Sequence, residues 1–161
     1  MPIGEAINVL LNIAGARMAE SGNPYGVALQ GGLTVLLEPS RVTHSVRSIE
    51  LYGGPATEPV ILADLSLLAN PADEVIRILV RGYGARVEDS GQFVVVDDLL
   101  VSLWRSYVAE GPDDPEGRYF ESVLVASLGY YEGQDRLAEG SASNGGEANR
   151  VESFGGGESL F

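Results

Sequence analysis

The residues that could carry out chemistry in this chain are few and scattered. His44 is the single histidine, and the chain contains no cysteine. A histidine acts as a general base or a metal ligand when a nucleophile or further ligands accompany it. Nothing in the sequence pattern pairs His44 with a serine nucleophile or with a second ligand. We therefore expect His44 to be an ordinary surface or strand residue.

Two acidic segments are candidates for carboxylate chemistry. Asp97 and Asp98 are adjacent, and adjacent residues on a helix point about 100° apart, so they would not share a face. The segment 110–116 lies in a turn rich in proline and glycine, and its spacing does not match a calcium-binding EF-hand loop. Its acidic residues are Glu110, Asp113, Asp114 and Glu116. The sequence thus predicts no catalytic residue and no metal site.

Gly82-Tyr83-Gly84 is the one glycine pair that resembles part of a phosphate-binding loop. The remaining glycine, the lysine and the following helix start that such a loop requires are missing. The pair is predicted to be a plain turn, and no cofactor is expected.

The charge of the chain limits its partners. The formal net charge is -13, and all ten basic residues are arginine. Binding to nucleic acid requires clustered basic residues, so this composition argues against it. An acidic surface repels DNA and would let it slide past, while adaptation to high salt is the alternative reason for the acidity. Without cysteine, disulfides and cysteine-based zinc sites are excluded.

Membrane and export segments are not expected. No apolar run approaches the roughly 20 residues that a membrane helix needs. Residues 3–19 lack a basic first region and are interrupted by polar side chains, so no signal peptide is predicted.

The elements that must position any site begin with a helix over residues 3–20, predicted from apolar residues at helical spacing. Two runs within 26–38, split by Gly31-Gly32, predict a strand or a hairpin. Residues 48–52 are predicted to be a strand, with a bulge or a break near Arg47-Ser48 where the alternation changes parity. Residues 56–73 are either a strand and a turn of helix or an excursion that covers the core.

The segment from Val75 to Ala109 is predicted to form the core strand and helix. The β-branched run 75–81, closed by Gly82, favours a strand, although its composition is also compatible with a helix. Residues 93–108 carry apolar side chains at helical spacing, which predicts a helix with Trp104 facing inward. The valines at its start are poor helix formers, so the first part is alternatively a strand.

The C-terminal third is expected to add a last strand to the sheet, followed by a segment rich in glycine and serine. Residues 120–128 alternate as a strand does. The segment 138–161 holds six glycines and four serines, and it is either a tail ordered by a partner or a hairpin turning at Asn144-Gly145. The prediction is one α/β (α+β) domain over residues 1–137: a mixed, mostly antiparallel sheet with two helices packed on it.

Three sequence blocks resemble a known family. They are Ile49-Glu50-Leu51-Tyr52-Gly53-Gly54, then Ile76 to Gly82, then Tyr119 to Ser127, and Gly133-Gln134-Asp135-Arg136 approximates a fourth motif. In this order they resemble the tail terminator and minor tail (neck) proteins of long-tailed bacteriophages. The sequence departs from the family in three places: Arg77 stands where the family has glutamine, the connection over residues 55–73 is long, and no obvious strand follows Asp135-Arg136 within Ser141 to Phe154.

The resemblance implies a structural virion protein without enzymatic activity. Such a protein forms a ring, usually of six copies, at the head-proximal end of the tail, where it joins the tail tube protein to the head–tail connector. DNA would pass through the ring without specific binding.

Six residues are predicted to contact a neighbouring copy or partner. Tyr130-Tyr131 follows the closing strand and is either an interface pair, since tyrosine anchors contacts well, or a turn aromatic. The full set is Tyr52, Arg81, Tyr130, Tyr131, Asp135 and Arg136. The rival hypothesis from the charge is an acidic immunity protein or inhibitor that masks a basic partner.

Overall fold

The computed structural model describes residues 1–20, 23–111, 114 and 117–130. The chain divides into two compact units, Met1–Leu128 and Gly129–Phe161, and all helices and strands named below lie in the first. None of the helices in the described part of the chain is long and apolar enough to cross a bilayer. The expected tail at 138–161, with its Asn144-Gly145 turn, lies outside the described residues.

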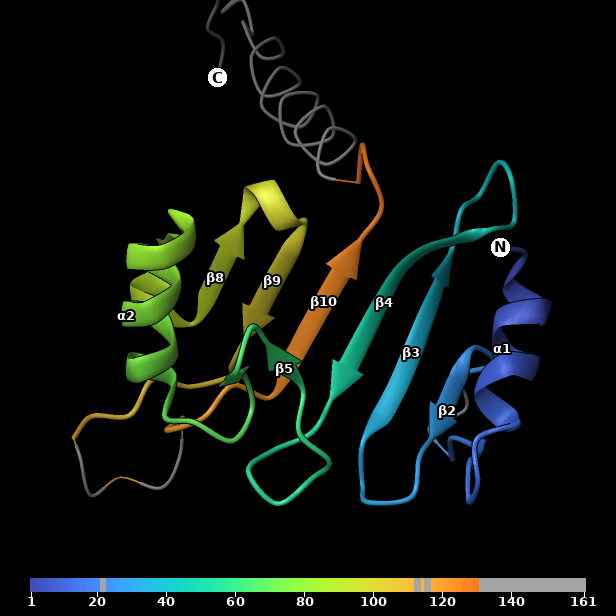
Figure 1. Cartoon of the computed structure of the whole chain (residues 1–161), viewed down its shortest axis with the longest axis horizontal. Helices are drawn as coiled ribbons and strands as arrows, with labels where there is room; N and C mark the ends of the chain where they lie inside the picture. Colours follow the sequence, from blue (N-terminus) through green and yellow to red (C-terminus); the bar gives the residue numbers. More distant parts are fainter. Residues whose placement is uncertain (21–22, 112–113, 115–116, 131–161) are drawn as a thin grey trace, which may run out of the picture. The chain divides into compact units, whose positions relative to one another are not determined.

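An antiparallel sheet of eight strands forms the framework (Figure 1). Its strand order is β1-β2-β3-β4-β10-β9-β8-β7, and every pair in it is antiparallel. The strands are β1 (Arg17–Met18), β2 (Gly26–Ala28), β3 (Thr34–Pro39), β4 (Val46–Tyr52), β7 (Arg86–Glu88), β8 (Phe93–Val96), β9 (Val101–Trp104) and β10 (Ser122–Ala126). The expected α+β class, a mostly antiparallel sheet with two helices, is confirmed.

Both helices pack on the same face of this sheet. Cross-strand partners place Val35, Leu51, Val123, Leu103 and Val94 in one row, because neighbouring strands present paired residues on one side. At one end of the row α1 (Ile3–Leu11) packs on β2 and β3, and at the other end α2 (Ala72–Tyr83) packs on β8 (Figure 1). Neither α1 nor α2, the two α-helices of the described residues, lies on the opposite face of the sheet, which is here called the helix-free face.

A small hairpin completes the core on the helical side. The strands β5 (Ile61–Leu62) and β6 (Leu65–Ser66) pair with each other, and Leu65, Leu67 and Leu68 are buried in the main core cluster. Of the two alternatives for residues 56–73, the excursion that covers the core is therefore the one observed.

The strand expected at 75–81 is wrong, because this segment is the centre of helix α2. Ala72, Val75 and Leu79 are fully buried at spacings of three and four, which is a helical stripe facing the core. Acidic residues occupy the first turn, and Gly84 caps the end with a left-handed φ of 65°. This amphipathic pattern outweighs the β-branched composition.

The helix expected over 93–108 is also wrong. The segment is the hairpin of β8 and β9, joined by a 3₁₀ turn at Asp97–Leu99 and by Leu100 in the left-handed region. A turn followed by one left-handed residue is a common way to reverse an antiparallel pair. Trp104, expected inward, lies on the helix-free face because it alternates with the buried Leu103.

The remaining predicted strands and the first helix are present in the structure. The hairpin within 26–38 and the strands at 48–52 and 120–128 are present, and pairing of Glu38 with Ser48 but Pro39 with Val46 confirms the bulge at Arg47. The first helix is shorter than expected, ending at Leu11. Gly15 is in the left-handed region, and the chain continues into strand β1.

Candidate interaction face

The described residues among those first considered for chemistry are dispersed over the chain. No three histidine, cysteine, aspartate or glutamate side chains in the described part of the chain lie close enough to hold a metal ion. His44 is exposed in the turn before β4, where its φ is 53°. Gly82 and Tyr83 form the end of α2 and Gly84 caps it, so the plain turn predicted after a strand is instead the end of a helix.

The helix-free face presents a row of side chains that runs across six strands. The register aligns them in the order Glu88, Phe93, Trp104, Ser122, Tyr52 and Thr34. Trp104 remains 40% exposed, although tryptophan is usually well buried. Phe93, Trp104 and Tyr52 are here called the aromatic row. Trp104 and Tyr52 lie two strands apart, about 10 Å, with the small, buried Ser122 between them.

A glutamate next to the aromatic row orders two neighbouring hydroxyls. Glu50 Oε1 accepts a hydrogen bond from Ser122 Oγ at 2.9 Å, and the Glu50 carboxylate also accepts one from the Tyr52 hydroxyl. Burial, reinforced by this hydrogen bond and by the charge of Glu50, raises the pKa of Tyr52 to about 12. Tyr52 is therefore a protonated hydrogen-bond donor held in a fixed position. The same pattern recurs where Ser48 Oγ donates to Glu38 Oε2 at 2.8 Å.

The outer end of this face carries a cluster of charges. Arg86 on the edge strand β7 donates to Asp97 through Nε at 2.7 Å and also contacts Glu88. The hydrogen bond from Arg86 holds the pKa of Asp97 below its usual value, and Asp97 in turn raises the pKa of Arg86. Charged side chains on a short edge strand discourage strand addition, so we do not assign a partner to this edge.

Arg105 anchors the segment that follows Trp104. Its guanidinium is 2% exposed and donates to Gly91 O at 2.9 Å, Gly117 O at 2.7 Å and Asp73 Oδ1 at 3.2 Å. The guanidinium also lies 5.5 Å from the ring centroid of Phe120. One arginine thus ties two loops to the first turn of α2, which fixes the end of β9.

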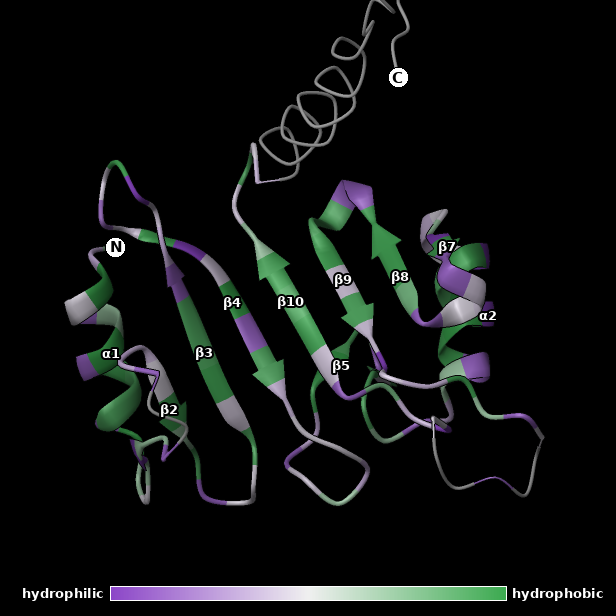
Figure 2. Ribbon diagram, turned by 180° about the vertical axis from the view of Figure 1, so that it is seen from behind, coloured by the Kyte–Doolittle hydropathy of each residue, from purple (hydrophilic) through white to green (hydrophobic). Residues whose placement is uncertain are grey.

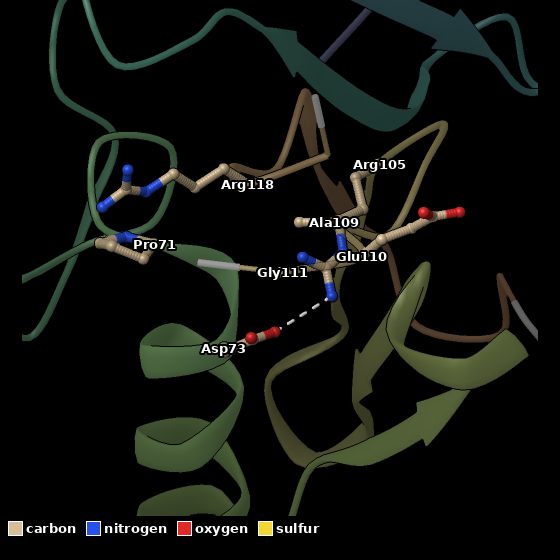
Figure 3. Close-up of a pocket in the computed structure, with 7 residues that line it drawn as sticks. All are labelled: Pro71, Asp73, Arg105, Ala109, Glu110, Gly111 and Arg118. Atoms are coloured by element: carbon tan, nitrogen blue, oxygen red, sulfur yellow. Dashed lines mark hydrogen bonds and ion pairs between the residues drawn. The ribbon is translucent and has the colours of Figure 1, made fainter. Parts of the chain in front are cut away.

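A cavity of about 460 Å³ opens beside Arg105 (Figure 3). Asp73, whose side chain is 87% exposed, lies at its wall and contacts Arg105, while the Arg118 side chain extends away from that contact. The three hydrogen bonds described above already engage Nε, Nη1 and Nη2 of Arg105. The cavity therefore reads as the space around a structural anchor, and the geometry assigns it no ligand.

The six residues predicted as interface do not form one site. Tyr52 lies on the helix-free face, and Arg81 is exposed on α2, which covers the other face. Tyr130 is buried in the second compact unit, and Tyr131, Asp135 and Arg136 lie outside the described residues. Sequence reasoning missed Trp104 and Phe93, whose alternation with buried valine and leucine would have indicated strands.

Comparisons with protein-family models, with curated proteins and with solved structures found no match to this chain.

Proposed function

We propose that this protein is a non-enzymatic structural subunit that assembles with copies of itself through its helix-free face. An antiparallel sheet tolerates one wet face, so the missing helix layer alone does not require a partner. The exposed Trp104, flanked by Phe93 and Tyr52, is the observation that supports a contact. Tryptophan and tyrosine dominate the residues that supply binding energy at protein interfaces.

We further propose that the assembly is a ring of the tail terminator or neck type, in a phage virion. Two blocks of the resemblance support this proposal: the strand β4 ends at Tyr52 before Gly53-Gly54, and the strand β10 lies within Tyr119 to Ser127. Ile76 to Gly82 is helical, so that block no longer supports the resemblance as a strand. The proposed ring, with six copies expected, would contact a tail tube protein and a head–tail connector.

The charge of the chain is compatible with DNA passing through such a ring. At a net charge of -13 per copy, an assembled ring repels phosphates and does not hold them. In this proposal DNA moves through without specific binding. A DNA-binding measurement at low salt is expected to find no retention of the duplex, and retention would contradict this part.

Substitution on the helix-free face tests the proposed assembly. Trp104→Ser removes the exposed aromatic side chain, and loss of a dominant contact residue costs about 2 kcal/mol, or about 30-fold in Kd. Ile61→Ser, an exposed apolar residue on the β5–β6 hairpin of the other face, is the control. Sedimentation velocity should show weakened self-association only for the first variant. If Trp104→Ser and Ile61→Ser self-associate equally strongly, the helix-free face is not the surface through which the copies assemble.

An acidic inhibitor of a basic protein is the second candidate, favoured by the net charge alone. Such a protein binds a basic partner as a heterodimer, with fast association that slows steeply as salt is added. A monomer of 17.0 kDa that binds a basic nuclease or toxin with this salt dependence would favour the inhibitor over the ring.

A further inference from the structure

The N-terminal helix is less buried than its composition requires. α1 reads Ile-Gly-Glu-Ala-Ile-Asn-Val-Leu-Leu, and of these nine residues only Ala6 is buried. Val9 is 53% exposed, and the large apolar side chains next to it are half-buried. A helix that is apolar on most of its surface normally has neighbours on more than one side. Here β2 and β3 cover one side.

A groove of about 160 Å³ lies where α1 meets the sheet, and all the residues that line it are apolar. Its walls come from α1, and its floor comes from β3 and β4. We call it the α1 groove, lined by Met1, Ala6, Val9, Leu10, Val35, Leu37 and Ile49. Val125 on β10, the cross-strand partner of Ile49, is also exposed and extends this apolar surface toward the centre of the sheet.

The distribution of charge points to another copy of this chain as the occupant. Residues 1–16 contain one charged side chain, Glu5, in a chain with a net charge of -13. Two strongly acidic subunits repel each other, and the repulsion is weakest where the contact surface carries the least charge. The α1 groove is such a surface. An apolar side chain entering it gains from burial, since no charged side chain lines the groove.

The aromatic row is the surface of a second copy that fits this groove. Its Phe93 and Trp104 belong to the helix-free face on β8 and β9, whereas the α1 groove belongs to the helical face near β3 and β4. Figure 1 and Figure 2 show β8 and β9 in one half of the sheet and β3 and β4 in the other, so these two aromatic residues and the groove lie in different halves and on opposite faces. Different patches at the two ends of a subunit give a head-to-tail contact, which closes into a ring when the rotation fits.

We propose that Trp104 and Phe93 of one subunit pack into the α1 groove of the next, so that neighbouring sheets overlap like tiles. The proposal rests on the self-assembly proposed above and names its second patch. It assigns Val9 and Ile49 to the receiving side and Trp104 to the inserting side of the same interface.

Cross-linking tests this pairing, and the natural absence of cysteine makes every introduced thiol unique. Val9→Cys places a thiol on the groove, and Ser106→Cys places one two residues beyond Trp104 without removing it. The two variants are purified separately, mixed, and treated with a short bismaleimide. We expect a cross-linked dimer from the mixture and none from either variant alone. Val80→Cys, an exposed valine on α2 at 43%, replaces Val9→Cys in the control mixture.

A charge placed in the groove gives an independent readout. Val9→Glu is expected to reduce the mass of the assembly to that of smaller species, while Val80→Glu leaves it unchanged, with both variants folded by circular dichroism. Cross-linking of Val9→Cys to itself would overturn the proposal in favour of paired α1 helices. An assembled wild type without the mixed cross-link would also overturn it, and the proposed function would survive. A wild type that stays at 17.0 kDa would refute both.

Discussion

Replacing Arg105 with methionine should destabilise the fold by a measurable amount. The guanidinium is buried and donates to the carbonyl oxygens of Gly91 and Gly117 and to the carboxylate of Asp73. Methionine keeps an unbranched apolar chain of similar length but offers no donor. The two carbonyl oxygens then lose their partner, while Asp73 can return to water because it is mostly exposed.

The expected loss follows from these contacts. A buried acceptor left without a donor costs about 1–3 kcal/mol. Two such acceptors give about 2–6 kcal/mol, and the cavity beside Arg105 admits water, which favours the lower half of that range. The exposed Asp73 adds about 0–1 kcal/mol. We therefore expect Arg105→Met to lower the free energy of unfolding by about 3 kcal/mol.

Urea unfolding followed by the fluorescence of Trp104, the single tryptophan, measures this change. Arg118→Met is the matched control, since it removes an exposed arginine from the same cavity and should cost at most about 0.5 kcal/mol. Arg105→Lys should recover only part of the loss, because an ammonium cannot reproduce the forked geometry of a guanidinium. If Arg105→Met unfolds at the same urea concentration as Arg118→Met, the anchoring role is refuted.

Three further predictions concern pH and backbone geometry. Because the pKa of Tyr52 is raised to about 12 from 10.0, its contribution to stability is complete below pH 10 and is lost as pH rises toward 12; Tyr52→Phe should remove this alkaline decline in urea titrations, and an unchanged profile would contradict it. Ala63 and Asp64 both have positive φ, at 44° and 69°. Replacing them with Asn-Gly should therefore raise the free energy of unfolding by about 1 kcal/mol, and a lower free energy of unfolding would contradict the presence of backbone strain in this turn. Gly117→Ala should destabilise by roughly 2 kcal/mol, because its φ is +66° and a Cβ would meet a backbone oxygen at 2.2 Å; Gly82→Ala in α2, where a Cβ meets nothing within 4 Å, should instead stabilise by about 0.5–1 kcal/mol.

The sequence predicted the β2–β3 hairpin and the bulge before β4 because residue type and alternation mark them locally. Gly31 and Gly32 adopt the left-handed conformation that reverses β2 into β3, with φ of 94° and 87°. The change of parity at Arg47 indicated the bulge that the strand pairing contains. These features are local, so the residues themselves determine them.

At the centre of the chain, the helix was predicted as a strand and the following hairpin as a helix, because two sequence patterns conflict there. The run from Val75 to Val80 is β-branched in composition, but its buried positions follow helical spacing. The residues from Phe93 to Trp104 permit helical spacing, but the two aspartates mark a turn between two four-residue strands. In each case the choice between helix and strand depends on which side chains are buried against distant strands, and local propensity does not contain this information.

The interaction face could be predicted only in part for the same reason. Tyr52 was identified from the Gly53-Gly54 turn that follows it, and it lies on the helix-free face. Trp104 could be recognised as exposed only once its neighbours on β8 and β10 were known, since the register of three strands places it there. The α1 groove likewise depends on residues from both ends of a long segment, such as Val9 and Ile49.

Native mass spectrometry of the wild-type protein tests the proposed self-assembly most directly. The account predicts one dominant species at a fixed multiple of 17.0 kDa, unchanged over a wide range of protein concentration, as a closed ring requires. It also predicts that Trp104→Ser shifts this species to the mass of single subunits. A wild-type protein found only at 17.0 kDa at every concentration would contradict the account.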